Sequence, residues 1–171
     1  MEQLLYLTLG CGAPLAAALF SVYLVRSINA HSPGPEVMQR IAALIRAGAM
    51  AFLKTEYKVL AVFVGLMFVI LCLFLPENAV LTGVSFLIGA LLSATAGWVG
   101  MRTATGAAVR TTFAATTSLA AALRVAFSSG AVMGLTVVAL GTAGVAILYY
   151  AFGGLTGNGP IAIEQLFGFS L

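Results

Sequence analysis

The run VLAVFVGLMFVILCLFL, from Val59 to Leu75, contains no charged side chain and indicates a membrane-spanning helix. A helix needs about 20 predominantly apolar residues to cross the hydrocarbon core of a bilayer, and this run approaches that length. No proline interrupts the chain from residue 36 to Pro76, and apolar residues recur at helical spacing over the first part of this stretch. We therefore predict one continuous helix over residues 36–75, which would be about 60 Å long.

The predicted helix is too long for the membrane alone. Its length is about twice the thickness of the hydrocarbon core, so half of it must stand outside the bilayer. Pro33, Gly34 and Pro35 separate it from any helix that comes before. We expect the apolar stripe of the protruding half to pack against other helices. The alternative is that this half lies flat on the membrane surface. The small number of basic residues and of bulky apolar side chains in it disfavours that arrangement.

The composition of the whole chain is that of a membrane protein. Of the 171 residues, 61% are hydrophobic and 8% are charged, and the mean hydropathy is +1.10. A soluble domain carries about 25% charged residues. The eight basic residues are too few and too scattered to follow the phosphates of a nucleic acid, so we expect no nucleic-acid partner. We predict an all-α, polytopic membrane helix bundle surrounded by membrane lipid.

Charge-free stretches divide the chain into spans and loops of a single membrane domain covering residues 1–171. The predicted spans are residues 3–25, 55–75, 79–102 and 127–152, with a partial span at 161–171 and cytoplasmic segments at 26–54 and 103–126. The fold would thus have four transmembrane helices plus the start of a fifth, with helices two to four extended into the cytoplasm. We interpret the last stretch as the opening of a fifth span that is cut off at Leu171.

The distribution of charge predicts the orientation of the bundle. All eight Lys and Arg residues lie in the segments between the first and second spans and between the third and fourth, or at the span ends that adjoin these segments, whereas Glu2, Glu77 and Glu164 lie on the opposite side. The positive-inside rule then places segments 26–54 and 103–126 in the cytoplasm and the N-terminus outside. We expect a multi-pass integral protein of a prokaryotic inner or plasma membrane.

Small residues and arginines are the two patterns to which we assign roles. Small side chains recur at every fourth position in the third and fourth spans and predict close helix packing, at Gly89, Ser93, Gly97, Gly130 and Gly134. Three arginines flank the inner ends of these spans and are predicted to anchor the cytoplasmic interface, at Arg102, Arg110 and Arg124. These arginines would set the topology and extend their guanidinium groups to the lipid head groups. The alternative is that they add positive potential around an anionic substrate.

No pattern indicates a catalytic, cofactor-binding or metal-binding residue within the chain. An ion carrier needs an ionisable group at membrane depth, and every charged residue lies at or beyond the end of a span. One histidine, two cysteines and scattered glutamates give no metal-ligand spacing. We interpret His31 as a solvated loop residue. We interpret Cys11 and Cys72 as small apolar packing residues, and a disulfide between them is the alternative.

Three segments, in order, carry a resemblance to a known family. They read MQRIA and IRAGAMAFL within residues 38–58, FLIGA and GWVGMRTAT within residues 86–111, and ALRVAF and GAVMGL within residues 122–135. Together they resemble the N-terminal quarter of the membrane-bound, ion-translocating inorganic pyrophosphatases, from about residue 36 to the end of the chain. Trp98 and Ala108 depart from the tyrosine and asparagine usual in that family.

The resemblance implies a function for a larger protein. Members of that family work as homodimers, hydrolyse pyrophosphate with Mg²⁺ and drive H⁺ or Na⁺ across the membrane, with K⁺ required in one subfamily. Their catalytic residues would lie beyond Leu171, so this chain would supply scaffold helices that pack against the remainder of the pump's helices and would be inactive alone. A non-catalytic four-span scaffold or assembly subunit is the alternative. A small transporter in its own right is disfavoured by the missing intramembrane charge.

Overall fold

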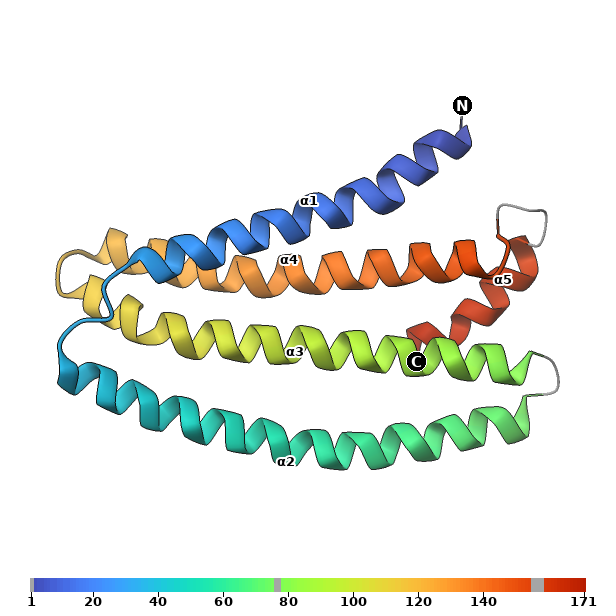
Figure 1. The fold of residues 1–171 in the computed structure, drawn as a ribbon, viewed down its shortest axis with the longest axis horizontal. Helices are drawn as coiled ribbons and strands as arrows, with labels where there is room; N and C mark the ends of the chain where they lie inside the picture. Colours follow the sequence, from blue (N-terminus) through green and yellow to red (C-terminus); the bar gives the residue numbers. More distant parts are fainter. Residues whose placement is uncertain (1, 76–77, 155–158) are drawn as a thin grey trace. The chain divides into compact units, whose positions relative to one another are not determined.

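The computed structural model of the chain describes residues 2–75, 78–154 and 159–171, with side chains from residue 10 onward. Within these ranges every regular element is a helix, which confirms the predicted all-α class. The elements are α1 (Glu2–Ala30), α2 (Glu36–Phe74), α3 (Ala79–Ala115), α4 (Leu119–Ala151), α5 (Gly159–Leu166) and the 3₁₀ helix η1 (Phe167–Ser170) (Figure 1).

Four helices in the described part of the chain are long and apolar enough to cross a membrane. The helices α2, α3 and α4 contain 39, 37 and 33 residues, so they are about 58, 55 and 50 Å long. Each exceeds the hydrocarbon thickness of about 30 Å. The single helix expected from residue 36 is therefore confirmed, and so are the extra lengths of the third and fourth helices.

The boundary between α1 and α2 follows from local chemistry. Gly34 has a φ of 78°, a left-handed conformation that glycine adopts without steric penalty. The side-chain Nε2 of Gln39 donates a hydrogen bond to the Gly34 carbonyl at 2.7 Å. Glu36 occupies the first turn of α2, where the helix dipole favours a negative charge, and pairs with Arg40 at 3.1 Å. Each of these contacts favours starting α2 at residue 36.

A short turn joins α3 to α4. The backbone N–H groups of Thr116 and Thr117 donate to carbonyls in the last turn of α3, so the helix closes there. Ser118 then caps α4, because its hydroxyl accepts a hydrogen bond from the N–H of Ala121 at 3.1 Å. The predicted segment 103–126 is therefore divided between the end of α3 and the start of α4, as expected if both helices extend beyond their spans.

The contacts within the chain define two compact units. The first unit contains Met1–Leu15, Tyr57–Thr95 and Val138–Leu171, and the second contains Ala16–Glu56 and Ala96–Val137. In the second unit, a core cluster forms from four buried side chains of α1, α3 and α4: Ile28, Ala107, Val125 and Val132. A methyl group added at Gly100 would lie 3.0 Å from Cγ of Met133, so α3 and α4 approach closely there.

In the first unit, the C-terminal segment packs against α3 and α4. Residues 161–171, expected as the opening of a span, form the end of α5 and then the tighter helix η1. Gly168 is buried against the Thr82 carbonyl of α3, and Phe169 contacts Gly89 of α3 and Gly144 of α4. Small residues at these positions leave room for the ring and backbone of η1.

A hydrogen bond between helices in the first unit yields a testable prediction. The Tyr57 hydroxyl of α2 donates to the Ala94 carbonyl of α3 at 2.5 Å. Replacing Tyr57 by phenylalanine should lower the free energy of unfolding by about 1 kcal/mol, the usual scale of such bonds between membrane helices. SDS-induced unfolding from mixed micelles measures this change. The matched control is Tyr23→Phe, because the described residues offer the Tyr23 hydroxyl no hydrogen-bond partner. Equal losses in the two variants would contradict the prediction.

Candidate functional site

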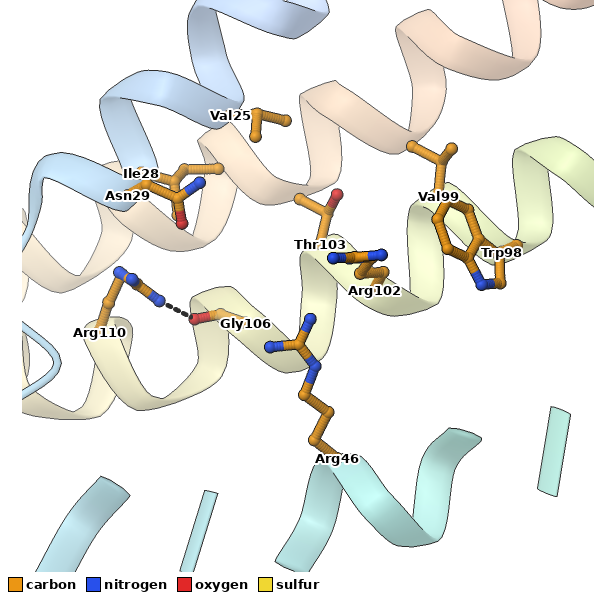
Figure 2. Close-up of a pocket in the computed structure, with 10 residues that line it drawn as sticks. All are labelled: Val25, Ile28, Asn29, Arg46, Trp98, Val99, Arg102, Thr103, Gly106 and Arg110. Atoms are coloured by element: carbon orange, nitrogen blue, oxygen red, sulfur yellow. Dashed lines mark hydrogen bonds between the residues drawn. The ribbon is translucent and has the colours of Figure 1, made fainter. Parts of the chain in front are cut away.

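A cavity of about 510 Å³ in the second unit is lined by α1, α2 and α3 (Figure 2). Its lining residues are Val25, Ile28 and Asn29 from α1, Arg46 from α2, and Trp98, Val99, Arg102, Thr103, Gly106 and Arg110 from α3. Three of these side chains carry a positive charge and none carries a negative one. The cavity therefore combines guanidinium groups with apolar surface.

The spacing of residues on α3 explains its part of the lining. Trp98, Arg102, Gly106 and Arg110 follow one another at every fourth position, which places them on one face of the helix. The guanidinium carbon of Arg102 lies 5.1 Å from the centroid of the Trp98 ring, within the range of a cation–π interaction. This interaction orients the Arg102 guanidinium along the cavity wall.

Arg110 is held in place by two backbone carbonyls. Its Nη1 donates to the Gly106 carbonyl at 2.7 Å, and its Nε donates to the His31 carbonyl at 3.2 Å. His31 is exposed and lies just after α1, with its Nδ1 2.9 Å from the Ser27 carbonyl. Arg110 thereby joins α3 to the end of α1 and retains further N–H donors on its guanidinium.

Arg46 reaches the cavity from a different helix. Figure 2 shows its side chain extending from α2 toward the part of α3 that carries Arg102 and Gly106. Arg46 and Arg110 also line an adjacent cavity of about 200 Å³, together with Gln39 and other residues of α2 and α3. The two cavities thus share two of the three guanidinium groups.

The structure brings together some of the predicted arginines but not all of them. Arg102 and Arg110 line the same cavity, whereas Arg124 is an exposed residue of α4 outside its lining. Arg46, which was predicted only as one of the basic residues of segment 26–54, also lines the cavity. The four-residue spacing from Trp98 could have identified the α3 face, but no sequence signal places Arg46 beside it, because that depends on how α2 packs.

The predicted small-residue positions lie in different surroundings. A methyl group at Gly89 would lie 2.9 Å from the Phe169 carbonyl oxygen, and Ser93 lines a groove of about 250 Å³ with Gly89 and Phe169. Gly97 is half-buried on α3. Gly130 and Gly134 are exposed on α4, and no described atom lies within 4 Å of a methyl group added at either. Close helix packing at this set of residues stays a prediction.

The described side chains do not fit a magnesium site. No three His, Cys, Asp or Glu side chains gather among them, and Mg²⁺ prefers carboxylate oxygens in octahedral geometry. Glu36 is engaged with Arg40 at an exposed position. Within the described residues, Cys11 and Cys72 are both free thiols.

Comparison with known proteins links the chain to one family. The family model described as inorganic H⁺ pyrophosphatase matches residues 15–171, and so begins earlier than the resemblance in sequence motifs suggested. The chain is 44% identical over 142 residues to the K⁺-insensitive pyrophosphate-energized proton pump 2 of Moorella thermoacetica, covering 83% of this chain and 20% of that protein. It is 49% identical over 142 residues to a putative K⁺-stimulated pyrophosphate-energized sodium pump of Clostridium tetani, covering 83% and 21%.

A third relative extends the match along the chain. The K⁺-insensitive pyrophosphate-energized proton pump of Caldanaerobacter subterraneus is 38% identical over an alignment of 171 positions. The alignment covers 93% of this chain and 24% of that protein. The chain spans about a fifth to a quarter of the length of these curated relatives and matches the N-terminal portion of the family. Because the family model covers nearly all of the described helices, this chain belongs to the inorganic H⁺ pyrophosphatase family.

Proposed function

We propose that this chain forms the N-terminal scaffold of a pyrophosphate-energized pump that couples pyrophosphate hydrolysis to H⁺ or Na⁺ transport across a membrane. The observation that carries this proposal is the family match over residues 15–171. The relatives it resembles are named as proton pumps in two cases and as a sodium pump in one. We assign the chain a structural role in that reaction.

The surfaces of the helices support a scaffold role. Among the described residues of α2, only Leu71 is buried, and large side chains such as Val37, Phe52 and Phe63 are exposed. Apolar helices of this kind require lipid or other helices around them. We propose that α2 contacts lipid and the pump's remaining helices, and that the α4 face with Gly130 and Gly134 receives a neighbouring helix of the pump or of its homodimer partner.

The orientation and the cofactors belong to the same proposal. The basic residues of segments 26–54 and 103–126 favour a cytoplasmic location for both and an outside location for the N-terminus. Arg102, Arg110 and Arg124 would anchor that cytoplasmic interface. Because the described residues do not fit a magnesium site, we propose that the Mg²⁺ of the intact pump, and K⁺ where it is required, bind outside this segment.

Exchange of the N-terminal segment tests the scaffold role. The matching segment of the Moorella thermoacetica pump would be replaced by residues 15–171 of this chain, and the chimera reconstituted in liposomes. Pyrophosphate-driven acidification and phosphate release should both persist, within about tenfold of the parent pump, because scaffold positions tolerate substitutions that conserve packing. A fluorescent pH probe and a phosphate assay measure the two activities.

Two controls make the exchange informative. The parent pump without its N-terminal segment should fail to assemble, and the 171-residue chain alone should release no phosphate from pyrophosphate with Mg²⁺. A chimera that reaches the membrane in normal amounts but neither hydrolyses nor pumps would contradict the proposal. It would favour a separate four-span assembly subunit instead.

A further inference from the structure

We propose that the cavity lined by Arg46, Arg102 and Arg110 binds a phosphate group, and that its source is the head group of an anionic phospholipid. The site goes beyond the pump function proposed above and does not depend on it. It rests on three features of the cavity: its uncompensated charge, its partly apolar wall and its position at the inner end of α3.

The positive charge of the cavity favours the binding of an anion. Three guanidinium groups line about 510 Å³ of shared space, and none of the lining side chains is a carboxylate. In the described part of the chain, an ion pair joins Glu36 to Arg40, neither of which lines this cavity. Like charges in one cavity repel each other, and a bound phosphate relieves that repulsion while accepting several hydrogen bonds.

The guanidinium groups are already oriented for such a ligand. Arg110 is fixed by the His31 and Gly106 carbonyls, and Arg102 is fixed against the Trp98 ring. Arg46 approaches from α2 on the opposite wall (Figure 2). Because two of the three side chains already have restricted rotamers, binding costs less conformational entropy than it would for free arginines. Guanidinium groups match the geometry of a phosphate better than ammonium groups do.

The apolar part of the wall favours a lipid over a free anion. Val25, Ile28 and Val99 line the cavity beside the arginines, and Trp98 is 43% exposed. An inorganic anion gains nothing from apolar side chains, whereas the glycerol and upper acyl chain of a phospholipid can contact them. Tryptophan is enriched where membrane meets water, and basic pockets between membrane helices on the cytoplasmic side bind anionic head groups.

The position along α3 agrees with the depth of a head group. Arg102 is the last residue of the predicted third span, and Arg110 lies about two turns beyond it. The cavity therefore occupies the stretch where the helix passes from hydrocarbon to head groups. A lipid phosphate would meet the arginines there without leaving the bilayer.

Trp98 offers a direct readout, because it is the only tryptophan of the chain and lines the cavity. The full 171-residue chain would be placed in nanodiscs of phosphatidylcholine containing phosphatidylglycerol, with one of the two lipids brominated near the glycerol end of its acyl chains. Bromine quenches tryptophan emission at short range. We expect brominated phosphatidylglycerol to quench Trp98 several-fold more than brominated phosphatidylcholine at equal mole fraction.

A pair of matched variants assigns the preference to the cavity. Arg46→Gln combined with Arg110→Gln leaves Arg102 on the Trp98 ring and should bring the quenching by the two lipids close to equality, given the usual contribution of each basic residue near an anionic surface. Arg26→Gln combined with Arg124→Gln changes the net charge equally, but neither residue lines the cavity. This control should keep most of the preference. Circular dichroism verifies that all variants keep their helices.

Three results would overturn the proposal. Equal quenching by the two lipids in the unchanged chain would show that no anionic lipid is selected. Equal loss in the two double variants would show that general attraction, and not the cavity, creates the preference. Loss of the preference on adding millimolar inorganic phosphate or pyrophosphate, at constant ionic strength, would assign the site to a soluble phosphate and overturn the lipid assignment.

Discussion

Replacing Gly168 by alanine is expected to detach η1 from α3. The added methyl group would lie 2.0 Å from the Thr82 carbonyl oxygen and 2.8 Å from its carbonyl carbon. Both are backbone atoms of a helix, so a rotamer change cannot relieve the clash and η1 itself must move. Overpacking of this kind destabilises by about 1–3 kcal/mol, and we expect the upper end here because a backbone is involved.

Hydrogen exchange measures the loss of docking locally. Amide protection of α5 and η1 should fall by about a hundredfold in Gly168→Ala, while the second unit keeps its protection. The matched control is Gly141→Ala, which lies in the same unit and where no described atom comes within 4 Å of the added methyl group. Unchanged protection of residues 159–170 in Gly168→Ala would contradict the expectation.

Replacing Gly34 by alanine is expected to lower the stability of the chain strongly. The φ of Gly34 is 78°, where a side chain is strained, and the added methyl group would lie 2.8 Å from Cδ2 of Phe113. Strain and clash act together, so the free energy of unfolding should fall by about 2–3 kcal/mol. Thermal unfolding of the chain in detergent, followed by circular dichroism, measures the change.

A second substitution separates the two causes. Phe113→Leu removes ring atoms from the contact, so Gly34→Ala should be roughly half as destabilising in that background. Gly34→Asn should be less destabilising than a β-branched replacement, because asparagine tolerates the left-handed conformation. Gly48→Ala is the control, since no described atom approaches its added methyl group and alanine favours a helix interior by about 1 kcal/mol. Equal effects of Gly34→Ala and Gly48→Ala would refute the role of Gly34.

Much of the helical architecture could be predicted from local patterns. The start of α2 at residue 36 follows from Pro33, Gly34 and Pro35, and its end follows from Pro76. Its length needed no knowledge of its neighbours, because the absence of helix breakers and a continuous apolar run are properties of the segment itself. The family, too, could be identified from ordered motifs.

The partners of individual residues were not predictable in the same way. Gly89 was predicted to allow close helix packing, but the sequence did not identify the segment that an added methyl group would meet, which is Phe169 of η1. A small residue permits a close approach, but it does not specify whether a segment packs there or which segment does. The change from α5 to η1 at Phe167 was not predicted, because it accompanies the packing of Gly168 on Thr82.

Local sequence patterns were enough to establish a bundle of long apolar helices with its basic residues gathered at the inner ends of the spans and in the segments that join them, since hydropathy, helix breakers and charge are properties of individual residues. The four-residue spacing of Trp98, Arg102, Gly106 and Arg110 is likewise enough to place them on one face of α3, although this face was not predicted. The approach of Arg46 of α2 and the end of α1 to that face, which creates a cavity lined by three arginines, depends on the tertiary fold. Contacts between segments far apart in the chain depend on side-chain packing, which no local pattern encodes.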